Sequence, residues 1–316
     1  MATANQLKIL IKSHFEDNSE KFNTVALQIA AHEAKVGHSN LANEIKQIID
    51  NGKKVSQKLK PLNPELQDLV LEIESVKRLS DLIVSNVIKD RINRVIREFT
   101  HRNKLLSHNL ENRRKILFSG PPGTGKTMSA SIIANELHLP IYVILMDKVV
   151  TKYMGETSAK LRQIFDLIAD RQAVYLFDEF DAIGSQRGKD NDVGEMRRVL
   201  NSFLQFLERD NSESLIIAAT NNLGMLDQAL FRRFDDVIHY DLPSDAEKIE
   251  LLKSRLDKNL TNNELKDLLP MLENLSHAEI NQACLDAIKE SILNNSDISL
   301  SLIKKTIKER TMAYKI

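Results

Sequence analysis

The sequence predicts an α/β fold in which helical regions precede and follow a parallel sheet of five strands. Two observations predict it. Five short runs of β-branched and aliphatic residues alternate with helical patterns, and a glycine-rich turn joins the first run to a helix. Near-continuous apolar strands separated by helices are typical of a parallel sheet covered on both faces. We therefore expect three domains, at residues 1–65, 66–241 and 242–316.

Composition and charge exclude several classes of protein. Of the 316 residues, 42% are hydrophobic and 28% are charged, as in ordinary globular proteins. Basic and acidic residues both number 44, so no overall positive field indicates nucleic acid or a membrane as a partner. Cys284 is the single cysteine, no secretory segment follows Met1, and no apolar run approaches the roughly 18 residues of a membrane span. We expect a cytoplasmic protein.

Residues 1–65 show only helical periodicity, in "LKILIKSHF", "FNTVALQIAAHEAKV" and "LANEIKQIID", and Gly37 is placed to end the second helix. The same region contains "HEAKVGH", which comes close to the zinc motif H-E-x-x-H. Two zinc-binding imidazoles on one helical face must lie four residues apart, and the residue four after His32 is Val36. No zinc site is therefore predicted.

The five predicted strands all lie within residues 66–241. They are "KILFS", "IYVIL", "AVYLF", "LIIAA" and "VIHY", at residues 115–119, 141–145, 173–177, 215–219 and 237–240. After Pro243 the pattern is helical only, in "AEKIELLKSRL", "NELKDLLPML", "HAEINQACLDAIKESIL" and "SLSLIKKTIKERT". The third domain is therefore expected to be entirely helical.

A phosphate-binding loop is predicted at "GPPGTGKT", which fits the pattern G-x-x-x-x-G-K-[ST] between a strand and a helix. Its glycines let backbone N–H groups wrap phosphates, and the helix start adds partial positive charge. Lys126 is placed to reach the β- and γ-phosphates, and the Thr127 hydroxyl to ligate Mg²⁺. The predicted cofactors are ATP and Mg²⁺, and the predicted contacts are Gly120, Pro121, Pro122, Gly123, Thr124, Gly125, Lys126, Thr127 and Met128.

Two carboxylates follow the third apolar run, in "VYLFDEF". Asp178 and Glu179 should emerge at the carboxyl edge of the sheet, where ligands bind in open α/β folds. Asp178 suits contact with Mg²⁺ through a water molecule, and Glu179 is the candidate base that orients the attacking water. An Asp-Glu pair alone is common at the start of helices. After an apolar strand and downstream of a phosphate-binding loop, it favours ATP hydrolysis.

From about residue 80 onward the chain resembles the AAA+ ATPases, in particular the clade of protein unfoldases and remodellers. "FDEFDAIGSQR" resembles that clade's extended Walker B segment, and "RRVLNSFLQFLE" followed by "LIIAATNN" resembles its second region of homology. The resemblance puts Asn221 at the sensor-1 position, holding the water or the γ-phosphate together with Glu179. It implies a P-loop AAA+ domain with a C-terminal helical lid, a small N-terminal helical domain, and assembly into a homo-oligomeric ring, expected to be a hexamer.

The segment "ALFRRFDDV" resembles the arginine-finger segment of the same clade. Arg233 matches the primary finger, with Arg232 beside it. A finger acts on the γ-phosphoryl bound by the neighbouring subunit, so it makes hydrolysis depend on assembly. Many relatives place a second arginine three residues after the first, where this chain has Asp236. A two-finger arrangement would therefore require Arg232 as the substitute.

Two further segments resemble parts of the nucleotide site. "LSHAEINQACLDA" is similar to the start of the clade's lid helix, and "LSDLIV" is similar to the entrance of the domain. The resemblance implies contacts from His277 and Ala278 to the ribose or base, and backbone contacts from Leu82 and Ile83 to adenine.

"TKYMGE", residues 151–156, resembles the first pore loop of the clade. Tyr153, Met154 and Gly155 would then grip a polypeptide substrate in the ring's channel without reading its sequence. The alternative is that Tyr153 and Met154 fill the core. "GKDNDVGE", residues 188–195, would be a second loop of the channel.

The resemblance therefore implies a ring that unfolds, threads or remodels proteins, with residues 1–65 binding substrate or a partner. The whole chain also resembles small bacterial AAA+ proteins that pair with a separate subtilisin-like serine protease, some in phage defence. Two alternatives remain. A DNA-acting loader would need a basic face or a DNA-binding domain, which the balanced charge disfavours. A nucleotide-gated scaffold or sensor in a defence complex is disfavoured by the intact set of hydrolytic residues.

Overall fold

The structure is a computed structural model that describes residues 4–15, 19–38, 41–46, 64–150, 154–183, 189–222, 224, 231–256 and 260–313. It divides into two compact units, Met1–Asn63 and Pro64–Ile316. The first unit contains helix α1 (Ala4–Phe15) packed against α2 (Ser19–Lys35), followed by helical residues 41–46. Gly37 has φ +97° just beyond α2, so the prediction that this glycine ends the helix is confirmed.

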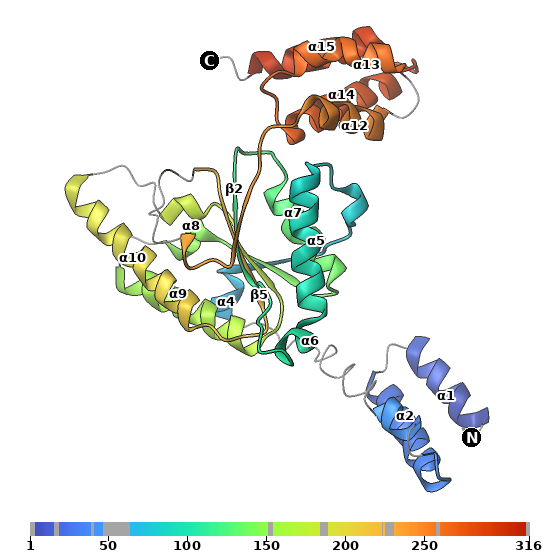
Figure 1. Cartoon of the computed structure of the whole chain (residues 1–316). Helices are drawn as coiled ribbons and strands as arrows, with labels where there is room; N and C mark the ends of the chain where they lie inside the picture. The colour runs from blue at the N-terminus through green and yellow to red at the C-terminus, as the bar shows by residue number, and fades with distance from the viewer. Residues whose placement is uncertain are drawn as a thin grey trace. The chain divides into compact units, whose positions relative to one another are not determined.

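The second unit is built on one sheet (Figure 1). The five expected strands run parallel in the order β3-β4-β5-β2-β6. Their bounds are Lys115–Ser119 for β2, Ile141–Ile144 for β3, Val174–Phe177 for β4, Leu215–Thr220 for β5 and Asp236–His239 for β6. The predicted α/β class and parallel strands are confirmed.

The prediction of five strands needs one correction, because a sixth strand, β1 (Val70–Ile73), pairs antiparallel with β3 at the edge of the sheet. Its sequence, "VLEI", lacks a continuous apolar run, since Leu71 and Glu72 are both exposed. An edge strand needs less burial than a central one, so the apolar pattern that revealed the other strands does not mark it.

Helices cover both faces of the sheet, as Figure 1 shows. One face carries α5 (Asn86–Thr100) and α7 (Lys126–Glu136), and the other carries α9 (Met154–Asp170) and α10 (Lys189–Arg209). α5 buries one helical stripe, Ile88, Ile92, Val95 and Phe99. On the opposite face, aromatic rings of Phe165, Phe177, Phe180, Phe203 and Phe206 pack together.

Several short elements complete the sheet layer. They are α4 (Pro64–Gln67), α6 (Arg102–Leu106), α8 (Met146–Val149) and the 3-10 turns η1 (Leu79–Asp81) and η2 (Phe180–Ile183). Residues 189–195, expected as a loop, instead form the start of α10. No helix in the described part of the chain is long and apolar enough to cross a membrane.

After β6, the described part of the chain is entirely helical, as predicted. α12 (Asp245–Leu256), α13 (Asn262–Leu268), the 3-10 turn η5 (Leu269–Leu272), α14 (His277–Leu293) and α15 (Leu300–Ala313) follow β6. They enclose a core of their own, to which Leu252, Leu268, Ile280 and Ile303 contribute. Ser276 and Glu279 form a reciprocal capping box at the start of α14, which fixes where this helix begins. Figure 1 shows these helices beyond one edge of the sheet, and we refer to them as the lid.

Candidate nucleotide site

A pocket of about 790 Å³ lies where the carboxyl ends of β2, β4 and β5 meet the lid. Its sheet side is lined by residues 122–128 of the glycine-rich turn, by Asp178 and Glu179 after β4, and by Asn221 after β5. These segments are far apart in sequence, and they meet because the carboxyl ends of parallel strands share one edge. The structure therefore brings the predicted phosphate, metal and hydrolytic residues together.

The turn between β2 and α7 depends on its glycines. Gly120, Gly123 and Gly125 have φ values of +142°, +74° and +100°. At Gly120, an added Cβ would stand 2.0 Å from the carbonyl oxygen of Tyr240. A larger residue there would displace β2 from the neighbouring strand, so glycine is required.

Lys126 is held at the centre of the site. Only 6% of the residue is exposed, and its Nζ donates to the carbonyl oxygens of Gly120 at 2.7 Å and Pro121 at 2.9 Å, and to Asn221 Oδ1 at 2.8 Å. Burial lowers the pKa of Lys126, while the negative charges of Asp178 and Asp181 oppose that shift. Gly120 and Pro121 thus contribute through contact with this lysine and are not among the residues that line the pocket.

Asp178 and Thr127 form a pair of oxygen groups beside the lysine. The Thr127 hydroxyl donates to Asp178 Oδ2 at 2.6 Å, and the Glu179 backbone N–H donates to Asp178 Oδ1 at 2.9 Å. Carboxylate and hydroxyl oxygens are ligands that suit Mg²⁺, which in such sites is held by one or two protein groups and by substrate phosphates. No cluster of three or more metal-binding side chains occurs among the residues described.

Glu179 is exposed to the pocket in an unusual backbone conformation, with φ +50°. Residues other than glycine rarely adopt this left-handed region, which costs free energy and concentrates at functional sites. The tight turn directs Glu179, the second residue after β4, into the pocket.

Asp181, which was not singled out in the sequence, supports the end of β5. Its Oδ1 accepts from the Thr220 hydroxyl at 3.3 Å and from the Asn221 backbone N–H at 3.2 Å. The signal was present in "FDEFD", where a third acidic residue follows the pair. Asp181 therefore helps to set the position from which Asn221 reaches Lys126.

The lid closes the pocket through direct contact with the glycine-rich turn. The Ala278 backbone N–H donates to the Gly123 carbonyl oxygen at 3.0 Å, and a Cβ on Gly123 would lie 2.5 Å from Ser276 Oγ. His277 and Ala278 line the pocket. The first turn of α14 is therefore seated on the phosphate-binding turn.

Leu82 and Ile83 also line the pocket, but their side chains belong to the two cores. Leu82 is only 2% exposed and packs in the sheet core, whereas Ile83 packs against the lid core. The segment from Lys77 to Ile83 thus forms the wall that joins the sheet to the lid.

Sequence reasoning missed a group of residues on the lid helices. Glu250, Leu251, Ser254 and Arg255 of α12 and Asn281 of α14 line the same pocket. The four residues of α12 share one helical face, but that spacing is also found in any amphipathic helix. Only the packing of α12 against α14 assigns this face to the pocket.

The two candidate finger residues lie at the amino edge of the sheet, where the parallel strands begin. Arg232 and Arg233 are exposed just before β6, and Arg233 pairs with Glu208 at the end of α10. Asp236, at the position of the missing second arginine, instead pairs with Arg91 of α5. Neither arginine lines the pocket of its own chain. Tyr153 lies outside the described residues, and Met154 and Gly155 are the first two residues of α9.

A mostly parallel sheet, a glycine-rich turn around a buried lysine, an acidic pair at the carboxyl edge and a helical lid define the class of P-loop nucleotide-hydrolysing domains. Residues 116–242 match the "ATPase family associated with various cellular activities (AAA)". The chain is 34% identical over 300 residues to the "Uncharacterized AAA family ATPase y4kL" of Sinorhizobium fredii, and the match covers 93% of this chain and 90% of that protein. The chain therefore belongs to the AAA ATPase family and is an ATPase, and the predicted resemblance is confirmed.

Other relatives share only part of their length with this chain. The "Proteasome-activating nucleotidase" of Methanococcus maripaludis is 32% identical over 214 residues, 63% of this chain and 52% of that protein. The "ATP-dependent zinc metalloprotease FtsH" of Mesomycoplasma conjunctivae is 32% identical over 237 residues, 70% of this chain and 31% of that protein. The chain thus spans about half of the nucleotidase. The crystal structure of the FIGL-1 AAA domain superposes with a TM-score of 0.62 at 19% identity, covering 82% of this chain and 96% of that one, which shows the fold alone.

Proposed function

We propose that this ATPase unfolds, threads or remodels protein substrates as a homo-oligomeric ring, expected to be a hexamer. The observation that carries the proposal is the shared ATPase sequence, since relatives that match this chain over 214 and 237 residues are named for activating the proteasome or for ATP-dependent proteolysis. Those names connect ATP turnover with protein breakdown. In this chain, an ATPase core with no protease motif would act on the protein substrate before a separate enzyme cleaves it.

The arrangement of the pocket supports specific roles in hydrolysis. Lys126 would leave its carbonyl partners to contact the β- and γ-phosphates, and Glu179 would act as the base that orients the attacking water. Asn221 would hold the same water or the γ-phosphate, because its amide already lies 2.8 Å from the lysine. Thr127 and Asp178, the latter through water, would hold Mg²⁺, which neutralises charge on the phosphate oxygens.

Assembly would complete the site. Arg233 and Arg232 are exposed at the opposite edge of the sheet from their own pocket, so they would serve the pocket of a neighbouring subunit. Both side chains of the Arg233–Glu208 ion pair are well exposed, so breaking this pair costs little free energy. Because Asp236 is engaged with Arg91, Arg232 is the second arginine that would take part.

The contact with substrate is proposed for Tyr153, Met154 and Gly155, and the first unit would select the client or a partner. A separate serine protease is the proposed enzyme downstream, within an antiviral defence role for the pair. These assignments rest on the sequence resemblance of "TKYMGE" and of the whole chain.

The decisive experiment combines unfolding and ATPase assays on Tyr153 variants. The wild-type ring should abolish the fluorescence of a green fluorescent protein that carries an unstructured tail, in an ATP-dependent manner. Tyr153→Ala should lose this activity about tenfold or more while basal ATPase stays within about twofold, because the aromatic grip is removed but the pocket is not. Tyr153→Phe, the matched control, should retain both activities.

Two results would contradict the proposal. Unfolding at the wild-type rate by Tyr153→Ala would make residues 151–156 an ordinary loop. A lower melting temperature with loss of both activities would instead place Tyr153 in the core.

A further inference from the structure

The lid side of the pocket carries polar atoms without hydrogen-bond partners. Among the described residues, five buried side-chain nitrogen or oxygen atoms lack a partner: Ser129 Oγ, Tyr240 Oη, both ring nitrogens of His277, and Asn281 Oδ1. The Ser129 and Tyr240 hydroxyls lie near each other in the core. The other three atoms belong to two residues that line the pocket. Buried polar groups are nearly always paired, so these three point to a ligand that pairs with them.

The two residues lie one behind the other on α14. His277 and Asn281 are four positions apart, and therefore share a face of the helix. The helix begins at the phosphate-binding turn, where Ala278 donates to Gly123. Asn281 lies about one turn, roughly 5 Å, farther along. A nucleotide whose phosphates occupied the turn would have room to extend its base in this direction, because Asn281 lines the same pocket.

The surroundings of Asn281 suit a flat, apolar ring with a polar edge. Leu251 of α12 and Ile83 of the joining segment line the same pocket, and both pack with the lid core that contains Ile280. α12 lies against α14, so the aliphatic groups and the amide converge from neighbouring elements. Aliphatic side chains would cover the faces of a base while the amide reads its edge.

We propose that Asn281 determines base specificity by reading adenine, with Oδ1 accepting a hydrogen bond from the 6-amino group and Nδ2 donating to N7. A primary amide matches this edge of adenine with two hydrogen bonds, whereas guanine presents two acceptors there. The proposal rests on the proposed nucleotide site and adds to it the side chain that selects the base. Burial lowers the pKa of His277, so its neutral ring offers one donor and one acceptor to the same ligand.

The neighbouring residue provides a matched control. Gln282 carries the same amide on the same helix, but its Nε2 donates to Asp286 Oδ1 at 2.8 Å and it does not line the pocket. Asn281→Leu removes the reading amide at similar volume, and Gln282→Leu removes an amide that faces elsewhere. Asn281→Asp keeps an acceptor for the 6-amino group and loses the donor to N7.

The test is calorimetric titration of the full-length chain with ADP, the diphosphate of purine riboside, which lacks the 6-amino group, and 7-deaza-ADP, which lacks N7. Wild type and Gln282→Leu should bind ADP about tenfold or more tightly than either analogue. For Asn281→Leu both ratios should fall to about 1. For Asn281→Asp the preference for the 6-amino group should persist while the preference for N7 disappears.

An Asn281→Leu protein that still distinguishes ADP from the purine analogue tenfold would overturn the proposal. Equal effects of Asn281→Leu and Gln282→Leu on these affinity ratios would also overturn it. So would a loss of affinity in Asn281→Leu that is seen with ADP and not with 2′-deoxy-ADP, because the amide would then contact the ribose 2′-hydroxyl. If these ratios fail while wild type hydrolyses ATP and unfolds protein, only the base contact is wrong. If wild type binds no adenine nucleotide, the nucleotide site itself is wrong.

Discussion

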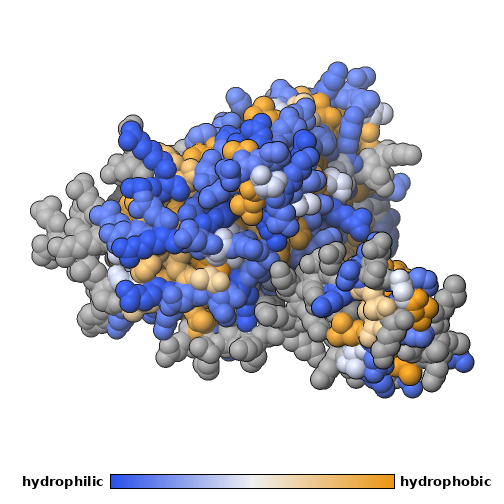
Figure 2. Space-filling model, turned by 60° about the horizontal axis from the view of Figure 1, so that its bottom comes forward, coloured by the Kyte–Doolittle hydropathy of each residue, from blue (hydrophilic) through white to orange (hydrophobic). Residues whose placement is uncertain are grey.

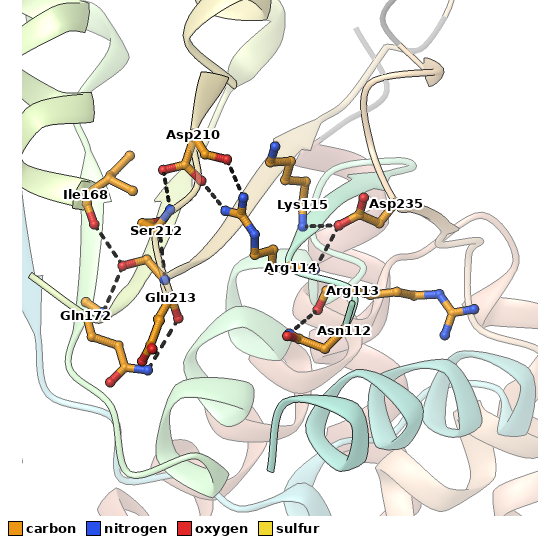
Figure 3. A network of polar contacts seen from close by, with 12 residues as sticks. Asn112, Arg113, Arg114, Lys115, Ile168, Gln172, Asp210, Ser212, Glu213 and Asp235 are labelled. Atoms are coloured by element: carbon orange, nitrogen blue, oxygen red, sulfur yellow. Dashed lines mark hydrogen bonds and ion pairs between the residues drawn. The ribbon is translucent and has the colours of Figure 1, made fainter. Parts of the chain in front are cut away.

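The two edges of the sheet are both rich in polar and charged residues, yet the structure uses them in different ways. At the carboxyl edge, Lys126, Asp178 and Glu179 surround the pocket. At the amino edge, Arg114 and Asp210 meet before β2 and β5 (Figure 3). Charge density alone does not separate the two regions. The two regions differ in what their polar groups contact. At one edge these groups are hydrogen-bonded to other groups of the chain, and at the other they line the pocket.

At the amino edge the polar groups bind each other. Arg114 donates to both the carboxylate and the backbone oxygen of Asp210, and Asp235 accepts from the backbone N–H groups of Arg114 and Lys115 at 2.9 Å each. Ser214 Oγ donates to the Ile168 carbonyl oxygen at 3.0 Å. The contacts in Figure 3 tie the starts of β2, β5 and β6 together. Figure 2, turned so that the bottom of Figure 1 comes forward, shows a surface dominated by hydrophilic residues.

The largest expected effect comes from the carboxyl edge. Glu179→Gln should lower ATP turnover about 100-fold or more, because a general base contributes at least that much, while the affinity for ATP is retained. The residue is exposed, so the melting temperature should stay within about 2 °C. Steady-state phosphate release and calorimetric binding measure the two quantities.

The control for this prediction is Glu213→Gln at the amino edge. The Glu213 side chain is exposed and its pair with Arg102 spans 3.4 Å, so neither turnover nor stability should change measurably. Unchanged turnover in Glu179→Gln would remove this residue from its proposed role.

The next effect comes from the amino edge and acts on stability. Arg114→Met should lower the free energy of unfolding by about 3 kcal/mol, because it leaves the buried carboxylate of Asp210 without its cation. Urea denaturation measures the loss, and the dissociation constant for ADP should not change. Arg113→Met, whose partner Glu98 is more exposed, should cost only about 1 kcal/mol. Weaker ADP binding without a loss of stability would break the division between the two edges.

The same contrast explains how far the sequence could predict the structure. The phosphate-binding turn and the Asp178–Glu179 pair are contiguous in sequence, and each follows an apolar strand, so their meeting at one edge was predictable. Arg255 and Asn281 reach the pocket only through the packing of α12 on α14, which no short motif records. β1 was missed because an edge strand carries little apolar pattern.

Pairing between side chains far apart in sequence was the other component that could not be predicted. Asp236 stands where many relatives have a second arginine, but in the structure it is the partner of Arg91, 145 positions earlier in the chain. Asp181 belongs to the segment that resembles the extended Walker B motif, and in the structure its carboxylate accepts hydrogen bonds from the end of β5. Such contacts depend on tertiary register, whereas turns and strands depend on neighbouring residues.

The substitution of Asp181 has the smallest expected effect and discriminates best between the two edges. Asp181 lies at the carboxyl edge, but its side chain accepts hydrogen bonds from other groups of the chain, as residues of the amino edge do. Its two contacts are long, at 3.3 and 3.2 Å, so Asp181→Asn should cost no more than about 1 kcal/mol of stability. It should lower kcat about fivefold while leaving the dissociation constant for ATP unchanged, because it shifts Asn221 without altering the phosphate-binding turn. Thr220→Val removes one of the two donors to Asp181 and should have a smaller effect on kcat in the same direction, with an added loss of stability because the Asn222 backbone N–H loses its acceptor at 3.1 Å. A change in stability alone would show that pairing within the chain makes a residue purely structural at either edge. A change in ATP affinity would show that Asp181 acts on Lys126, either through Asn221 or through its own negative charge.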